Sequence, residues 1–316
     1  MNFSNCIIGI SQQNDIDELL RLGFRRFYFG YIDKEYIENY ATQISPNRRY
    51  RLKEQYTSIE RITQDITKIK QQGGTLYLAL NAFFTNEIIL EEIKRNFTLF
   101  ADKVDGMIVA NMPTLLYLHS LRYDKIVLSN LFGFYSKEAV AFFLQFSPIK
   151  IILPRDIIIE ELESIVSYYK EVQFEAFLFG DNCRFSEAFC FSEHGYDSLE
   201  FGSLCGYAIN SKKSINKADI HFKHIIKNPK LLQEQKAAQL KTIYTNESYQ
   251  TFDKEDNPYK IFHKLNKTAI LKTIEIFQKY PNIVSYKIPS RGREFAKFLL
   301  GDEIELYNYK ESQYDL

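Results

Sequence analysis

The stretch Val172-Gln-Phe-Glu-Ala-Phe-Leu-Phe179 runs directly into Gly180-Asp-Asn-Cys183, and these twelve residues decide how the chain is interpreted. The first eight have the aromatic and apolar content of a buried strand, and Gly180 ends it. Cys190 and Cys205 follow, so three of the chain's four cysteines come after this one strand. The stretch therefore predicts a strand with a cysteine-bearing loop at its carboxyl end.

Other short apolar runs lie on both sides of this strand, and helical patterns separate them. They cover residues 6–10, 26–30, 75–80, 106–110, 125–129, 149–153 and, after a long interval, 283–288. Strands that alternate with helices indicate a parallel sheet, and eight such units predict an α/β fold of the TIM-like (β/α)8 barrel type. We expect the last strand, 283–288, to close the barrel by pairing with both 6–10 and 172–179.

The interval before the last strand is the least barrel-like part of the chain. We interpret residues 1–316 as a single barrel domain in which 181–280 form an insertion between strands seven and eight, with helical patterns at 229–242 and 259–279. Loops that follow the carboxyl ends of barrel strands carry the chemistry in this fold. The insertion is therefore expected beside the active site.

Polar residues that come directly after the predicted strands are further site candidates. Asn81 and Asn111 each follow a strand and are equally interpretable as helix caps, whereas Arg155 follows the strand at 149–153. Arg291 and Arg293 flank a glycine after the last strand, a pattern typical of an anion-binding turn.

The spacing of the cysteines limits the metal that they could bind. Six residues separate Cys183 from Cys190, and fourteen separate Cys190 from Cys205. Structural zinc sites favour pairs split by two to four residues, so the spacing leaves an iron–sulfur cluster or plain thiols. Cys6 lies inside an apolar run and has the pattern of a buried, inert thiol.

Composition and terminal sequence narrow the cellular setting more than the partner. Forty basic residues balance forty acidic ones, so net charge does not indicate RNA binding, and RNA as a partner would have to be bound by a local basic patch. The sequence contains neither a recognisable signal peptide nor an apolar run that could span a membrane. We expect a cytoplasmic protein with reduced thiols and no membrane partner.

Several segments resemble peptidase family U32, the collagenase-like proteins. The run from Glu175 through Gly180 and Cys183 to Cys190 resembles the family signature Glu-x-Phe-x-His-Gly-x-x-Cys-x-x-x-Ser-Gly-x-Cys. Three further segments agree in the same order, at 76–81, 153–156 and 284–293. The sequence departs from the signature at Phe179, where the family has His.

The resemblance implies an α/β barrel with a 4Fe-4S cluster held by four cysteines. It places three of them at Cys183, Cys190 and Cys205. The fourth is missing, because Ile209 stands where some relatives have a cysteine. Other relatives have their fourth cysteine later in the sequence, and His221 stands at that position in this chain. His221 is therefore the expected fourth ligand, and Cys6 is the alternative.

The resemblance also implies a function. Better understood members are oxygen-independent hydroxylases of a ubiquinone precursor or of RNA bases, with prephenate implicated as oxygen donor. By this reading Arg155, Arg291, Arg293 and Asn81 bind a small anionic molecule. The alternative is an accessory subunit that forms a heterodimer with a related barrel protein. Peptidase activity is a further alternative, but the sequence contains neither a nucleophile elbow nor a zinc-protease motif to support it.

Overall fold

The computed structural model describes most of the first 178 residues and several later elements. The described ranges are 3–40, 45–49, 54–82, 85–155, 157–178, 249–253, 261–265, 267–288 and 305–306.

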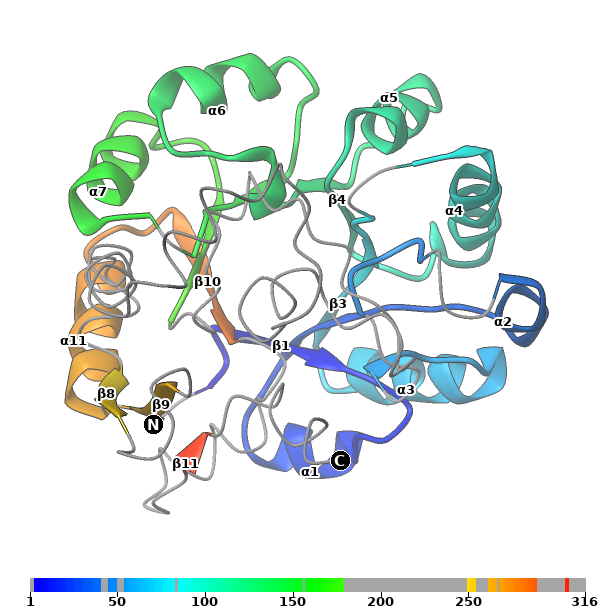
Figure 1. The fold of residues 1–316 in the computed structure, drawn as a ribbon, viewed down its shortest axis with the longest axis horizontal. Coiled ribbons are helices and arrows are strands. Elements are labelled where there is room, and N and C mark those ends of the chain that lie inside the picture. The colour runs from blue at the N-terminus through cyan, green and yellow to red at the C-terminus, as the bar shows by residue number, and fades with distance from the viewer. Residues whose placement is uncertain are drawn as a thin grey trace, which may run out of the picture.

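Eight parallel strands form a closed barrel, as the sequence predicted (Figure 1). Around the barrel the order is β1-β10-β7-β6-β5-β4-β3-β2. The strands are β1 (Cys6–Ile10), β2 (Arg26–Phe29), β3 (Thr75–Leu80), β4 (Gly106–Val109), β5 (Ile126–Leu128), β6 (Lys150–Ile152), β7 (Phe174–Phe177) and β10 (Ile283–Ile288).

Helices surround the strands and connect one to the next (Figure 1). They are α1 (Ile16–Arg21), α2 (Lys34–Tyr40), α3 (Ile59–Gln71), α4 (Glu87–Phe100), α5 (Met112–Ser120), α6 (Lys137–Leu144), α7 (Ile159–Tyr168) and α11 (Lys267–Gln278), with the short 3-10 helix η2 (Asn130–Phe132) after β5. Their starts follow capping chemistry. Asp15 caps α1 by accepting from Glu18 N, and Ser136 caps α6 by accepting from Ala139 N.

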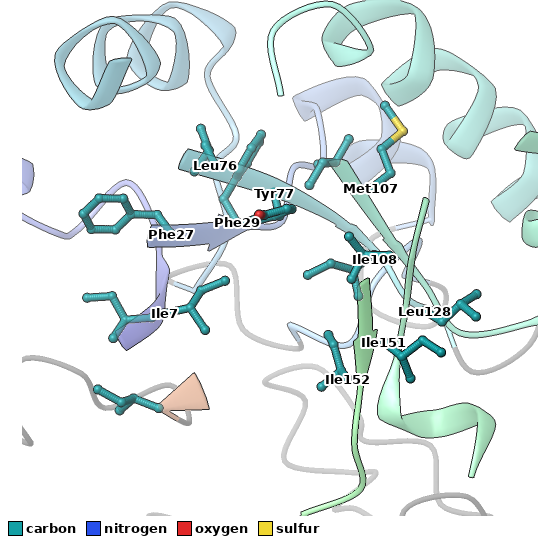
Figure 2. Close-up of a cluster of buried hydrophobic side chains, with 14 of the residues drawn as sticks. Ile7, Phe27, Phe29, Leu76, Tyr77, Met107, Ile108, Leu128, Ile151 and Ile152 are labelled. Atoms are coloured by element: carbon teal, nitrogen blue, oxygen red, sulfur yellow. The ribbon is translucent and has the colours of Figure 1, made fainter. Parts of the chain in front are cut away.

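The strands are buried on both faces, which is why they appear in the sequence as continuous apolar runs. Figure 2 shows side chains of this core, of which the labelled ones come from β1 to β6. Those that face outward pack against the helices. On β10, for example, the ring of Tyr286 lies 5.6 Å from the ring of Phe277 on α11.

The predicted closure of the barrel is confirmed. β10 pairs in parallel with β1, placing Cys6 opposite Tyr286, and with β7, placing Ser285 opposite Glu175. A register irregularity lies between Ile283 and Ser285. The last strand therefore joins two strands that are far apart in the sequence.

The part of the insertion that is described contains two strands, β8 (Tyr249–Asp253) and β9 (Ile261–Leu265), where the sequence predicted none. The pattern at 259–279 was expected to be one helix, but β9 precedes α11. β9 pairs in antiparallel fashion with β8 and with β11 (Glu305–Leu306) in a separate three-stranded sheet. Apolar alternation over five residues fits a strand as well as a helical turn, which explains the error. No helix among the described residues is long and apolar enough to cross a membrane.

Candidate functional site

Three charged side chains meet inside the barrel, on three neighbouring strands. Lys150 comes from β6, Glu175 from β7 and Lys287 from β10, and we call them the lumen triad. Lys150 Nζ donates to Glu175 Oε2 at 2.6 Å, and Lys287 Nζ donates to Glu175 Oε1 at 2.8 Å. Ser285 Oγ also donates to Glu175 Oε2, at 2.9 Å. Each carboxylate oxygen thus holds one lysine.

The triad is almost completely removed from solvent. Glu175 is 0% exposed, Lys150 is 2% exposed and Lys287 is 7% exposed. Burial alone would raise the pKa of Glu175, but the charges and hydrogen bonds of the two lysines outweigh it and lower the pKa to about 2. Burial lowers the pKa of Lys150, against the opposing pull of Glu175. One ionised carboxylate therefore faces two amines.

Two tyrosine rings complete the surroundings of the lysines. Lys150 Nζ lies 4.0 Å from the ring centroid of Tyr77, and Lys287 Nζ lies 4.0 Å from that of Tyr28. The negative face of an aromatic ring stabilises a cation at this distance. The site therefore stabilises positively charged nitrogen at two positions, one on either side of Glu175.

Glycines on two strands make room for these rings. A Cβ atom on Gly106 of β4 would lie 3.2 Å from Tyr77 Cδ1, and one on Gly9 of β1 would lie 2.9 Å from Tyr28 Cζ. The Gly9 position is the tighter, because the added Cβ would also meet Arg49 Nη1 at 2.4 Å. A side chain at Gly9 would therefore displace Arg49 or Tyr28, whereas one at Gly106 would meet the backbone oxygen of Lys125 at 2.8 Å.

Arg49 is a further cation near the Tyr28 ring and Lys287. Its Cζ lies 5.2 Å from the Tyr28 ring centroid, and its Nε donates to the backbone oxygen of Glu54 at 2.6 Å. Gln55 Nε2 donates to Arg49 O at 2.5 Å and fixes the backbone. Arg49 Nη1 is buried and has no hydrogen-bond acceptor among the described residues.

Two of the predicted substrate-binding residues lie within the described part of the chain. Arg155, three residues beyond the carboxyl end of β6, lies with its Cζ 5.2 Å from the ring centroid of Phe177 on β7. Phe177 in turn lies 5.9 Å from Lys287 Nζ. Arg155 therefore stands at the same end of the barrel as Lys287. Arg291 and Arg293 lie outside the described residues.

Asn81 and Asn111, which the sequence made equally interpretable as helix caps, have different roles in the structure. Asn111 is a helix cap, because its Oδ1 accepts from Thr114 N at 3.0 Å at the start of α5. Asn81 does not cap α4, because the N-cap of that helix is Asn86. Instead Asn81 Oδ1 accepts from Arg48 N at 3.2 Å and holds the segment that carries Arg49.

The proposed cluster ligands Cys183, Cys190, Cys205 and His221 all lie outside the described residues. Within the described residues no group of three or more His, Cys, Asp or Glu side chains could hold a metal ion.

Cys6 is poorly suited to be a fourth ligand. It is the first residue of β1, at the amino end of the strand, and it pairs with the outward-facing Tyr286. The loop after β7 starts at the opposite, carboxyl end of the barrel. Burial also raises the pKa of the Cys6 thiol to about 12, which disfavours the thiolate that a metal requires.

Sequence reasoning missed the triad as a site, although a signal was present. Lys150 and Lys287 each adjoin apolar strand residues, and Glu175 stands between aromatic and small ones. Charged residues in strands that are buried on both faces must be paired, so their presence indicates partners elsewhere in the lumen. Arg49, in contrast, gives no comparable signal, because it lies in a polar connection.

Comparison with known proteins gives a consistent family. The model of peptidase family U32 matches residues 24–200, which is more than half of the chain. A solved structure of a U32 peptidase, Mk0906, aligns with 14% sequence identity and a TM-score of 0.39, over 56% of this chain and 68% of that chain. No curated protein matches the chain. On the strength of the family model, the chain belongs to peptidase family U32.

Proposed function

We propose that this protein is an iron–sulfur-dependent, oxygen-independent hydroxylase that acts on a small aromatic or quinone precursor or on an RNA base. A small anionic molecule, for which the resemblance indicates prephenate, would bind at the carboxyl end of the barrel as oxygen donor. The observation that carries the proposal is the gathering of Lys287, Arg49 and Arg155 at this end, around the rings of Tyr28 and Phe177. Guanidinium and ammonium groups near aromatic faces suit a flat anion.

The topology supports the location. β7 ends at Phe177, and the cysteine-bearing segment follows it in the sequence, so that segment leaves the barrel at the end where the cations lie. Three thiolates and an imidazole, from Cys183, Cys190, Cys205 and His221, form a donor set that iron–sulfur clusters accept. When bound, a cluster would supply one-electron chemistry. The residues of the lumen would bind and orient the anion.

An accessory role is the second candidate, and specific residues favour it. Phe179 replaces the signature histidine, and Ile209 replaces a cysteine of some relatives. In this case the protein would pair with a related barrel protein that carries the activity, and its own lumen would serve binding alone.

Anaerobic purification with iron and acid-labile sulfide analysis tests the proposal. We expect iron and acid-labile sulfide in the wild-type chain in the proportions of one 4Fe-4S cluster. His221→Ala should lose iron or change the visible spectrum, and His221→Cys should keep the cluster and lower its potential, since thiolate adds negative charge.

Cys6→Ser is the matched control, and its iron content should equal that of the wild type. Zinc alone, or no metal after anaerobic purification, would contradict the hydroxylase proposal. Product formed only after a related barrel protein is added would favour the accessory role.

A further inference from the structure

The lumen triad has a chemical capacity that hydroxylation does not use. It presents two primary amines on either side of one carboxylate, inside a barrel, and one of the amines is nearer to solvent. Lys150 is the first residue of β6 and is 2% exposed, whereas Lys287 is the last but one residue of β10 and is 7% exposed. Lys287 is therefore the amine that a small molecule entering from the carboxyl end would meet.

We infer that Lys287 captures the carbonyl group of a small 2-oxo acid as a covalent iminium. A buried lysine beside a second cationic group is a recognised arrangement for attack on carbonyl compounds. In the overall step the Nζ–C bond forms and the C=O bond breaks. The ammonium gives two hydrogens to the carbonyl oxygen, which leaves as water, so that atoms and charge both balance.

The iminium would keep every contact that the ammonium makes. Its remaining N–H still donates to Glu175 Oε1, and its positive charge still lies over the Tyr28 ring. Lys287 Nζ has only one acceptor among the described residues, so losing two N–H groups breaks no hydrogen bond observed there. The site is therefore as complementary to the product cation as to the free lysine.

Lys150 supplies what the reaction needs from a neighbour. It donates to Glu175 Oε2 at 2.6 Å and so holds the carboxylate in place beside Lys287, while burial lowers the pKa of Lys150 itself. Ser285 Oγ, 3.4 Å from Lys150 Nζ, keeps the second carboxylate oxygen engaged. We treat Lys150 and Glu175 as positioning residues.

The carboxylate of the ligand has a binding partner on the same ring. Arg49 packs against Tyr28, as Lys287 does, and its buried Nη1 has no acceptor among the described residues. An acid whose carbonyl carbon adjoins its carboxylate could engage both cations at once. A simple ketone or aldehyde lacks the second contact, which is why the inference specifies a 2-oxo acid.

Reductive trapping tests the inference, with pyruvate as the probe and cyanoborohydride as the reductant. The full-length chain should gain one reduced pyruvyl group, and peptide mass spectrometry should place it on Lys287. We expect labelling at least about tenfold faster than at exposed lysines. Acetone should label Lys287 much more slowly than pyruvate does, and Arg49→Gln should remove that preference.

Lys287→Arg is the decisive variant, because arginine keeps the charge beside Glu175 but cannot form an imine. It should abolish the rapid label. Lys103→Arg is the matched control, since the exposed Lys103 also lies over an aromatic ring, that of the buried Phe100. Labelling spread evenly over exposed lysines, labelling of Lys150 in place of Lys287, or no label would each overturn the inference.

The inference does not require the cluster, so the two proposals can fail separately. Trapping is to be repeated with Cys183→Ser, which removes an expected cluster ligand. A label on Lys287 in that variant supports carbonyl capture even if the protein is not a hydroxylase. A cluster without a label supports only the proposed function.

Discussion

At the scale of single residues, Glu92 illustrates how burial without a close partner changes a carboxyl group. It lies on α4 and is 3% exposed, and its nearest cation is Arg95, whose Nε lies 3.8 Å from Oε2. Arg95 is already engaged by Asp33. Burial, with Asp33 and Glu35 adding to it and Arg95 opposing, raises the pKa of Glu92 from 4.5 to about 7.

This raised pKa predicts a loss of stability with rising pH. Between pH 4.5 and about 7 the folded protein keeps a proton on Glu92 that the unfolded chain releases, so the free energy of unfolding falls across this window. Glu92→Gln should remove that decline and, at pH 8, stabilise the protein by roughly 1–3 kcal/mol. Urea unfolding followed by circular dichroism at several pH values measures it.

Glu91→Gln on the same helix is the control for Glu92→Gln. Glu91 is exposed and pairs with Lys94, so its replacement should leave the pH profile unchanged. If the unfolding free energy of the wild type and of Glu92→Gln changed with pH in the same way, the raised pKa of Glu92 would be contradicted.

Residues also show where the sequence is insufficient. Asn81 and Asn111 both follow apolar strands, and the main local difference is Pro113, a residue type typical of a first helical turn, shortly after Asn111. Asn111 Oδ1 accepts from Thr114 N, three residues later, although its Nδ2 also donates to Ala82 O at 2.8 Å. The partner of Asn81 Oδ1 lies 33 residues earlier. Local chemistry is encoded locally, but a contact over 33 residues depends on how the loop is placed.

At the scale of elements, the strands of the barrel were predictable and the connections between them less so. β1, β3 and β10 have the predicted bounds, and the other five strands lie within the predicted runs. A strand buried on both faces gives a continuous apolar signal. β9 was missed because five residues are too few to separate the two periodicities.

The lumen triad could not be predicted from any one element, because it needs three strands in register. Lys150 and Glu175 are 25 residues apart, and Glu175 and Lys287 are 112 apart. A sequence shows that each charge requires a partner, but the closed sheet alone determines which partner it receives.

The triad predicts an asymmetric response to substitution. Glu175→Gln leaves two buried amines without a counter-charge and should destabilise the protein by about 3–5 kcal/mol at pH 7. The triple variant Lys150→Met, Glu175→Leu and Lys287→Met removes all three charges and should recover most of that loss. Denaturant unfolding of both variants measures the difference.

Glu171→Gln, at an exposed position just before β7, is the control for the triad variants and should change the unfolding free energy little. If Glu175→Gln were as stable as the wild type, the carboxylate would not be the counter-charge of the lysines.

At the scale of the whole molecule, the sequence predicted a closed barrel, and closure depends on a single late strand. β10 is the neighbour of both β1 and β7. A chain ending at residue 178 lacks it and leaves two sheet edges unpaired. We expect this chain to associate or to remain unfolded, as measured by size-exclusion chromatography and circular dichroism.

A chain ending at residue 288 keeps all eight strands of the barrel and is the matched control, which we expect to be monomeric and to unfold cooperatively. Cooperative, monomeric unfolding of the chain ending at 178 would show that seven strands are sufficient.

The late position of β10 also has a consequence for how the protein is made. During synthesis the ribosome must add roughly a hundred residues after β7 before the closing strand appears, which takes about 5–20 s at ordinary elongation rates. Throughout that time the nascent chain carries two open edges, and Glu175 has met Lys150 but not Lys287. We expect the emerging polypeptide to need chaperones until Lys287 arrives, so that cells depleted of them would lose this protein early, whatever the stability of its finished form.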